Sequence, residues 1–379
     1  MSGEVAPVLL SLLSAPVAKL GGQEIRWGRL ASYLLDHSPV KIRVVINSSL
    51  VQCLRNIGIH LEGTSVIVMR DQGSKIAHNL YAQWTLWRAM QSGEILHIPA
   101  VGIRTIYTAL LGKYLRGCRV VFSYTTNTFR GYLDNPLNIK AFRLVRRIAK
   151  HVDIFEVINP HIDWQGIVPE NKLRIAPCSF SDPSRFKPAE KKANKVVFAG
   201  HLSTAKGVYL LIDILRAWPK GDPTWFTICG DSDGSRSSQQ AQKLLDELCS
   251  TRPTWKRIRL DDISQELSDA KVFLSLQEVS NYPSQSLLEA LLSGCCVVAT
   301  NTGESNLLVR EPFGVLLDKK APPQAFIESV QSFLRMPWDQ FKIRSDAARD
   351  FVLKHHTIEK YAEHIVGMWA ELGARAEKV

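Results

Sequence analysis

The sequence lacks the long apolar run that a membrane-spanning helix requires. No part of the 379 residues reaches the roughly 18 uninterrupted apolar residues of such a span. The apolar stretch Pro7–Leu20 is short and has no basic flank before it, which makes it a poor signal peptide. We therefore expect it to form a buried first strand and the turn that follows.

Cysteines are few, odd in number and scattered. No pair has the C-x-x-C arrangement or the spacing of metal ligands, and most lie inside apolar runs. This favours reduced core thiols in a cytoplasmic protein over a disulfide framework or a cysteine metal site. The seven are Cys53, Cys118, Cys178, Cys229, Cys249, Cys295 and Cys296.

Acidic residues are fewer than basic ones: the chain has 36 acids and 47 lysines and arginines, a formal net charge of +11. Such an excess predicts an anionic partner, which includes nucleic acid, a membrane surface and phosphorylated substrates. Basic residues are spread widely along the chain and no recognisable nucleic-acid module is present, so nucleic acid is the least favoured. The composition, 45% hydrophobic and 22% charged, is ordinary for a globular protein, and the length suggests about two domains.

Short Val/Ile/Leu runs alternate with helical patterns along the chain, which predicts two α/β blocks with parallel sheets covered on both faces. Among the predicted elements are helices at Tyr81–Gln91 and Val208–Ala217 and a strand at Arg119–Tyr124. The polar, proline-containing stretch Ser181–Asn194 is the best inter-domain linker. We expect a first domain at residues 1–185, a second at 186–355, and a last helix within 356–379 that crosses back to the first. Ligands of such sheets bind outside the carboxyl ends of the strands, here facing each other across a cleft.

The stretch Asn281–Thr300 organises the second block. It predicts a loop, a helix that begins near Ser284, a stop at Gly294 and a buried strand. Free N–H groups and the positive dipole end at such a helix start favour a phosphate. Glu289, about one turn into the helix, suits a ribose diol. The plain alternative is a loop–helix–strand unit with a solvated glutamate.

Glycine loops precede helices in both blocks. Gly21-Gly22 lies between the first strand and a helix, and glycine there permits close approach of a ligand. In the second block, Gly200 and His201 begin a loop that ends at Lys206, whose ammonium suits a departing diphosphate. Each signal is weak alone, because glycines also make turns and loop lysines are usually solvated.

The helix Asn138–Val152 is basic and amphipathic. Its apolar stripe predicts packing against a core, and its charged side is either solvated or in contact with an anionic membrane or a lipid-phosphate acceptor. The charged residues at helical spacing are Arg143, Arg146, Arg147 and Lys150.

The second block resembles the C-terminal half of family-4 retaining glycosyltransferases (group 1) with the GT-B fold. The resemblance covers Lys195–Leu215, Phe226–Gly234 and Val272–Leu308, including Leu-Leu-Glu-Ala-Leu-x-Ser-Gly before Val-Val-Ala-Thr. The first block resembles the family more thinly, through its glycine loop and Pro169–Arg174. The implied fold is two Rossmann-like domains, and the implied activity is sugar transfer with anomeric retention.

The resemblance implies a donor site for a UDP- or GDP-sugar, without a metal or other cofactor. Glu289 would hold the ribose, the backbone at Ser286–Leu288 and Lys206 the diphosphate, and Gly22 would approach it from the first domain. No Asp-x-Asp stands in a convincing metal position. The catalytic residues implied are Lys206, Glu289 and Asn281, and the donor residues are Gly21, Gly22, Gly200, His201, Lys206, Gly230, Ser286, Leu287, Leu288 and Glu289.

The sequence departs from the family at two site positions. Asn281 stands where the family often has the first Glu of E-x7-E, and His201 stands where it usually has Arg. We expect a hexosyltransferase of cell-surface polysaccharide biosynthesis that acts on a glycan or lipid-linked acceptor, cytoplasmic and peripheral at the inner membrane face. The alternatives are a sugar-nucleotide epimerase of the same fold and a low-activity GT-B binding subunit.

Overall fold

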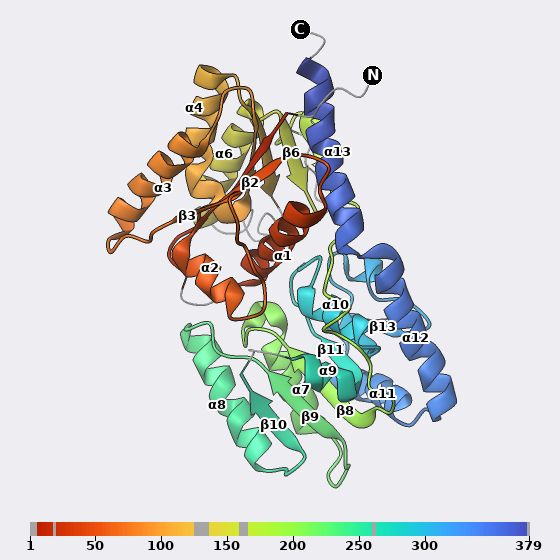
Figure 1. The fold of residues 1–379 in the computed structure, drawn as a ribbon. Helices are drawn as coiled ribbons and strands as arrows, with labels where there is room; N and C mark the ends of the chain where they lie inside the picture. Colours follow the sequence, from red (N-terminus) through yellow and green to blue (C-terminus); the bar gives the residue numbers. More distant parts are fainter. Residues whose placement is uncertain (1–5, 18–19, 125–135, 159–165, 260–262, 377–379) are drawn as a thin grey trace. The chain divides into compact units, whose positions relative to one another are not determined.

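The computed structural model describes residues 6–17, 20–124, 136–158, 166–259 and 263–376, and it contains two compact domains (Figure 1). The first comprises Met1–Ser179 with Ile358–Val379, and the second comprises Phe180–Thr357. The boundary after Ser179 lies six residues before the predicted one, and the boundary after Thr357 lies two residues after the predicted one. The polar stretch 181–194 is not a free linker, because Phe186 is buried in the second domain's core and its carbonyl accepts a hydrogen bond from Arg349 Nη1.

The first domain is built on a seven-stranded parallel sheet in the order β3-β2-β1-β4-β5-β6-β7. Its central strands are mostly apolar because both of their faces are covered, and each also carries a buried polar residue such as Ser11 or Ser123. The strands are β1 Val8–Leu12, β2 Ile42–Asn47, β3 Val66–Met69, β4 Ile95–Pro99, β5 Arg119–Tyr124, β6 Ile154–Val157 and β7 Leu173–Ile175.

Helices cover both faces of this sheet. Three of them, α3 Lys75–Ala89, α4 Ile106–Arg116 and α6 Pro136–His151, contribute to one apolar cluster with alternate strand residues (Figure 1). On the other face, α1 Gly22–His37 contacts α13 Ile358–Ala376, the last helix of the chain. α13 thus completes the first domain, although 178 residues of the second domain, Phe180–Thr357, precede it in the sequence.

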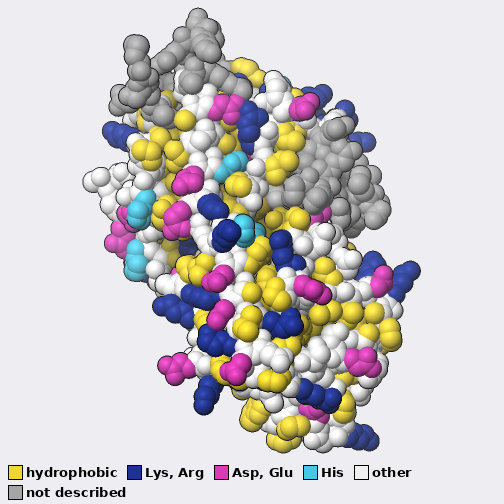
Figure 2. Space-filling view, turned by 90° about the vertical axis from the view of Figure 1, so that its right-hand side faces the viewer, with side chains coloured by type: hydrophobic (Ala, Val, Ile, Leu, Met, Phe, Trp, Pro, Cys, Tyr) yellow, Lys and Arg dark blue, Asp and Glu magenta, His cyan; other side chains and the backbone are white. Residues whose placement is uncertain are grey.

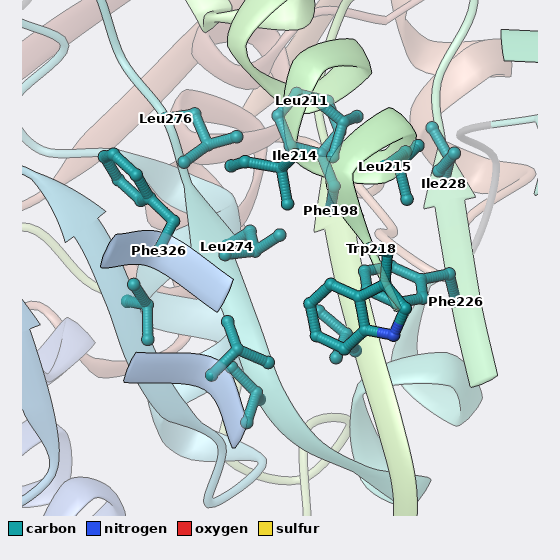
Figure 3. Close-up of a cluster of buried hydrophobic side chains, with 14 of the residues drawn as sticks. Phe198, Leu211, Ile214, Leu215, Trp218, Phe226, Ile228, Leu274, Leu276 and Phe326 are labelled. Carbon is teal, nitrogen blue, oxygen red and sulfur yellow. The ribbon is translucent and has the colours of Figure 1, made fainter. Parts of the chain in front are cut away.

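The second domain has a six-stranded parallel sheet in the order β10-β9-β8-β11-β12-β13. One face packs α7 Val208–Ala217, α8 Arg236–Ser250 and α11 Pro323–Leu334 around Trp218, Phe226 and Phe326 (Figure 3). The other packs α9 Ser264–Asp269, α10 Gln285–Leu292 and α12 Trp338–His355. The strands are β8 Ala193–Ala199, β9 Trp225–Cys229, β10 Trp255–Ile258, β11 Ala270–Ser275, β12 Cys296–Thr300 and β13 Gly314–Leu317.

One helix begins well before its predicted start, and another was not predicted. α3 was predicted at Tyr81–Gln91 but begins six residues earlier, because the Ser74 side chain caps it by accepting a hydrogen bond from the Ala77 N–H. α2, Ser48–Arg55, was not predicted. Its start depends on Asp71, whose carboxylate accepts hydrogen bonds from Ser48 Oγ and the Ser49 N–H.

Candidate functional site

The order of the second sheet places a topological switch point between β8 and β11. The chain proceeds from β8 to β9 on one side and later adds β11 on the other side of β8. The loops that leave the carboxyl ends of β8 and β11 therefore diverge, and ligands of doubly wound sheets bind between such loops. Ser284–Leu287 and the loop Gly200–Gly207 both lie at this end of the sheet.

Two glycines fix the close packing of the loops. Gly207 has φ +73°, and an added Cβ would lie 1.7 Å from the Leu276 carbonyl oxygen. An added Cβ at Gly230 would lie 2.1 Å from the Gly200 carbonyl oxygen. The backbone itself therefore requires both glycines, and Gly230 serves the packing of the loop after β9 against the loop after β8.

Lys206 is the cation of this site. Its side chain is partly buried, and no carboxylate or carbonyl of the described residues pairs with its ammonium group. Burial lowers the pKa of Lys206 to about 8, because the charged form loses hydration without gaining a partner. An added Cβ on Gly200 would lie 3.7 Å from Lys206 Cδ, so the lysine stem runs along the loop after β8. A partly buried ammonium without a partner favours the binding of an anion.

The start of α10 offers unpaired backbone donors. Ser284 makes no side-chain cap, and among the described residues Gln285, Ser286 and Leu287 have no acceptor for their N–H groups. The N–H of Leu288 is bonded to the Ser284 carbonyl at 3.1 Å, so the expected donor set Ser286–Leu288 is corrected to 285–287. The side chains of Leu287 and Leu288 are core residues.

One hydrogen bond joins this helix start to the strand β8. Ser286 Oγ donates to the Ala199 carbonyl at 3.3 Å, and Ala199 immediately precedes Gly200. The N–H of Glu278, after β11, donates to the Ala205 carbonyl at 3.1 Å, beside Lys206. The structure thus brings the loop Gly200–Gly207 and the start of α10 together at one edge of the sheet.

Glu289 and Asn281 lie on α10 and on the loop before it. Gln285 Nε2 donates to Glu289 Oε1 at 3.3 Å. The Asn281 side chain is partly buried and makes no hydrogen bond with the described residues. Next to it, Ser280 Oγ donates to the buried carboxylate of Glu304. This bond, which sequence reasoning missed, ties the Asn281 loop to the loop after β12; no sequence spacing signals it.

His201 and the glycine pair occupy exposed positions. The His201 side chain is exposed, and its charge adds to the hydrogen bonds of Ser235 that lower the pKa of Asp233. In the first domain, the Gly21 N–H donates to Glu24 Oε2 at 3.1 Å and starts α1. Gly22 has no atom within 4 Å of an added Cβ and no left-handed φ, so its backbone does not require glycine.

The predicted basic residues of α6 face solvent. Arg143, Arg146, Arg147 and Lys150 are all exposed, and none forms an ion pair with the described residues. Val145, Ile148 and Ala149 bury the opposite side of the helix.

A buried polar network occupies the first domain. His97 of β4 lies between Ser123 Oγ, 2.6 Å from its Nε2, and Trp369 Nε1, which donates to its Nδ1 at 3.1 Å. Burial lowers the pKa of His97 to about 4, so the ring is neutral at pH 7. Tyr361 donates to the buried Glu156 at 3.0 Å. These bonds attach α13 to β4 and β6 and join β4 to β5.

Among the residues that the structure describes, no three His, Cys, Asp or Glu side chains are grouped so as to hold a metal ion. A search of the same residues finds no helix with the length and apolarity to cross a membrane.

Comparisons with known proteins address the second domain most directly. The family of glycosyl transferases group 1 matches residues 180–350. No curated protein matches the sequence. The second domain, which contains Lys206 and α10, is therefore a group 1 glycosyltransferase domain.

Solved structures resemble the whole chain in fold. Sucrose-phosphate synthase from Thermosynechococcus elongatus has a TM-score of 0.76 at 15% identity, over 98% of this chain and all of that one. HepE from Anabaena, in complex with UDP and glucose, has a TM-score of 0.74 at 14% identity over 97% and 100%. A glycosyltransferase from Rickettsia africae has a TM-score of 0.68 at 15% identity over 97% and 98%. The predicted GT-B fold, two Rossmann-like domains, is confirmed.

Proposed function

We propose that this glycosyltransferase, whose residues 180–350 form a group 1 domain, moves a sugar from a nucleoside diphosphate donor to a glycan or lipid-linked acceptor with retention of anomeric configuration. The observation that carries the proposal is the partly buried ammonium of Lys206, which has no partner among the described residues and lies beside the uncapped start of α10. Because HepE, which shares the fold, was solved in complex with UDP and glucose, a uridine diphosphate sugar is the first donor to test.

The donor diphosphate would bind at the start of α10. The N–H groups of residues 285–287 and the helix dipole stabilise anionic oxygens there, and Lys206 adds a full positive charge. Anion binding also restores a partner to the ammonium, which raises the pKa of Lys206 again. These groups supply the charge that a divalent metal supplies elsewhere. We assign Glu289 to the ribose diol and His201 to an outer phosphate oxygen.

Sugar transfer would proceed on this scaffold mainly by positioning and by stabilisation of the leaving group. The bond between the anomeric carbon and the diphosphate oxygen breaks, and the acceptor oxygen forms a bond to the same carbon on the same face. The acceptor proton passes to the departing phosphate oxygen, so no protein nucleophile is needed. Asn281, with a side chain that makes no hydrogen bond to the described residues, is assigned to a sugar hydroxyl.

The acceptor is proposed to be anionic or membrane-bound. The exposed, unpaired basic side of α6 supports this assignment, because four cations at helical spacing attract phosphate or an anionic surface. The corresponding role is assembly of a cell-surface polysaccharide at the inner face of the membrane.

A thermal-shift screen over UDP-, GDP- and ADP-sugars tests the donor assignment. A true donor raises the melting temperature by mass action, and the Lys206→Met variant should lose this rise while remaining folded. Candidate acceptors are then supplied with the donor that binds. Absence of any shift with all three classes would refute the proposal, and conversion of the donor without an acceptor would identify an epimerase instead.

A further inference from the structure

The net positive charge of the chain is concentrated in one segment, although basic residues occur throughout. Residues 72–152 contain twelve lysines and arginines and two acids, a formal +10 of the total +11. The second domain, 180–357, is nearly balanced, with 23 basic and 21 acidic residues. Of the two acids in the segment, Glu94 is buried and pairs with Arg43 at 2.6 Å. α3, α4 and α6 contain no acid at all.

The same helices expose large apolar side chains. Of fifteen large hydrophobic residues that are exposed in the described chain, eight lie on α3 and α4. They recur at helical spacing on the solvent side of each helix, opposite the buried faces of Ala82 and Leu86 and of Ile106 and Ala109. The eight are Ile76, Leu80, Tyr81 and Trp84 on α3 and Tyr107, Leu111, Tyr114 and Leu115 on α4.

Contacts join the three helices into one continuous layer. Arg104, just before α4, donates to Asn79 of α3 at 2.9 Å. Lys113 of α4 donates to the carbonyl of His151, the last residue of α6, at 2.9 Å. On α3, the Arg88 guanidinium lies 4.8 Å from the Trp84 ring, which stacks on Tyr81. We call this surface the α3–α4–α6 layer. By contrast, the face drawn in Figure 2 carries acidic and basic side chains intermixed.

We propose that the α3–α4–α6 layer binds an anionic lipid bilayer, with the apolar side chains of α3 and α4 inserted at the interface and the cations of α6 against the lipid headgroups. Tyrosine and tryptophan prefer this boundary, and leucine and isoleucine gain free energy by entering it. Each lysine or arginine near the surface adds electrostatic attraction. The inference deepens the proposed function, on which it rests for the membrane-bound acceptor.

Other occupants fit the layer less well. A second copy of the chain would bring two segments of +10 together, and like charges repel. Single-stranded nucleic acid would use the aromatic rings and the cations, but it offers no apolar partner for Ile76, Leu80, Leu111 and Leu115. A bilayer with anionic headgroups satisfies both the apolar and the basic residues.

Vesicle flotation with the full chain tests the proposal. We expect binding to vesicles of phosphatidylcholine with phosphatidylglycerol and little binding to phosphatidylcholine alone. A variant with Leu80→Gln, Trp84→Gln, Leu111→Gln and Leu115→Gln should bind anionic vesicles at least about tenfold less. The matched control is Ile343→Gln, since Ile343 is 68% exposed on α12 of the second domain. A second variant neutralises Arg143, Arg146, Arg147 and Lys150 to Gln, and its control neutralises Lys220, Lys243, Lys319 and Lys320.

Three results would overturn the inference: equal binding to neutral and anionic vesicles, unchanged binding of the α3–α4 variant, or an equal loss in the Ile343→Gln control. Loss of a dimer in the variant, without vesicle binding by the native chain, would assign the layer to a second copy and also refute the proposal. Donor-induced thermal shift, measured without lipid, should be the same in all these variants. If that shift is absent in the native chain, the donor assignment fails, whatever the vesicles show.

Discussion

The two domains share a topology but differ in how the polar groups at their sheets are hydrogen-bonded. In each sheet the first strand lies inside the sheet and the order reverses beside it, between β1 and β4 and between β8 and β11. The second domain leaves Lys206 and the first N–H groups of α10 without partners among the described residues. The first domain pairs His97 with Ser123 and Trp369, and Glu156 with Tyr361. The same fold therefore holds unpaired donors for a ligand in one half and, in the other, a buried network in which both ring nitrogens of His97 are hydrogen-bonded.

The difference has a thermodynamic consequence. A partly buried charge without a partner lowers stability, whereas buried hydrogen bonds such as those of His97 and Tyr361 stabilise and orient the groups that form them. Substitutions in the second domain's site should therefore separate activity from stability, and substitutions in the first domain's network should change stability first.

The largest expected effect is that of Lys206→Met. Donor turnover should fall about a thousandfold, because the leaving diphosphate loses its full positive charge. Stability should rise by about 1 kcal/mol, since an apolar side chain of similar length removes the burial cost that lowers the pKa of Lys206 to about 8. Kinetic assays and denaturant unfolding measure the two. A variant that loses both activity and stability would show that Lys206 is a structural residue.

Glu289→Gln should come next. We expect the donor KM to rise about thirtyfold, because a charged acceptor for the ribose hydroxyls becomes neutral. Glu328→Gln on α11 is a matched control, since Gln324 Nε2 donates to Glu328 at 3.1 Å as Gln285 does to Glu289 at 3.3 Å. Equal KM changes in both variants would exclude Glu289 from the donor site.

Trp369→Phe tests the buried hydrogen-bond network of the first domain. The buried Nδ1 of His97 loses its donor, which should lower the free energy of unfolding by about 2 kcal/mol. Trp225→Phe on β9 is the control, because Trp225 is 51% exposed and its loss should change stability little. The donor-induced thermal shift should persist in both variants. Equal stability of the two variants would show that the Trp369 hydrogen bond does not hold α13 in place.

Donor binding should also depend on pH. The pKa of Lys206 lies at about 8, so the unliganded lysine is largely charged at pH 7 and largely neutral at pH 9. Donor affinity should fall about tenfold between these values. Lys206→Arg keeps its charge throughout and should flatten the profile. A profile that is equally steep in Lys206→Arg would assign the dependence to another group.

The smallest expected effect is that of Asn281→Glu. We expect kcat/KM to fall about threefold, because the added carboxylate repels the diphosphate. The added carboxylate also lies beside the loop that holds the buried Glu304. Asn281→Asp, with its shorter side chain, should fall less. A rise in activity would show instead that Asn281 is an impaired form of the family's glutamate.

Much of the architecture could be predicted because it depends on local pattern. The predicted bounds of α7, Val208–Ala217, and of β5, Arg119–Tyr124, agree with the structure. β5 is a mostly apolar run, and α7 has apolar residues at helical spacing. α2 was missed because its start relies on Asp71, a residue that follows it by 16 positions or more. Local propensity contains no information about such a partner.

The sequence by itself determined the α/β alternation, the place of Lys206 in a loop between a strand and a helix, and the helix start near Ser284. The tertiary structure alone decided that positions 207 and 230 must be glycine, because an added Cβ would meet the carbonyl oxygens of Leu276 and Gly200. It also decided that Lys206 is partly buried without a partner among the described residues, and that Trp369 of α13 bonds to His97. The physical reason is the range of the interactions. Apolar periodicity acts over a few residues, whereas the desolvation of Lys206 and the Trp369–His97 bond depend on groups brought together only by the folded sheets.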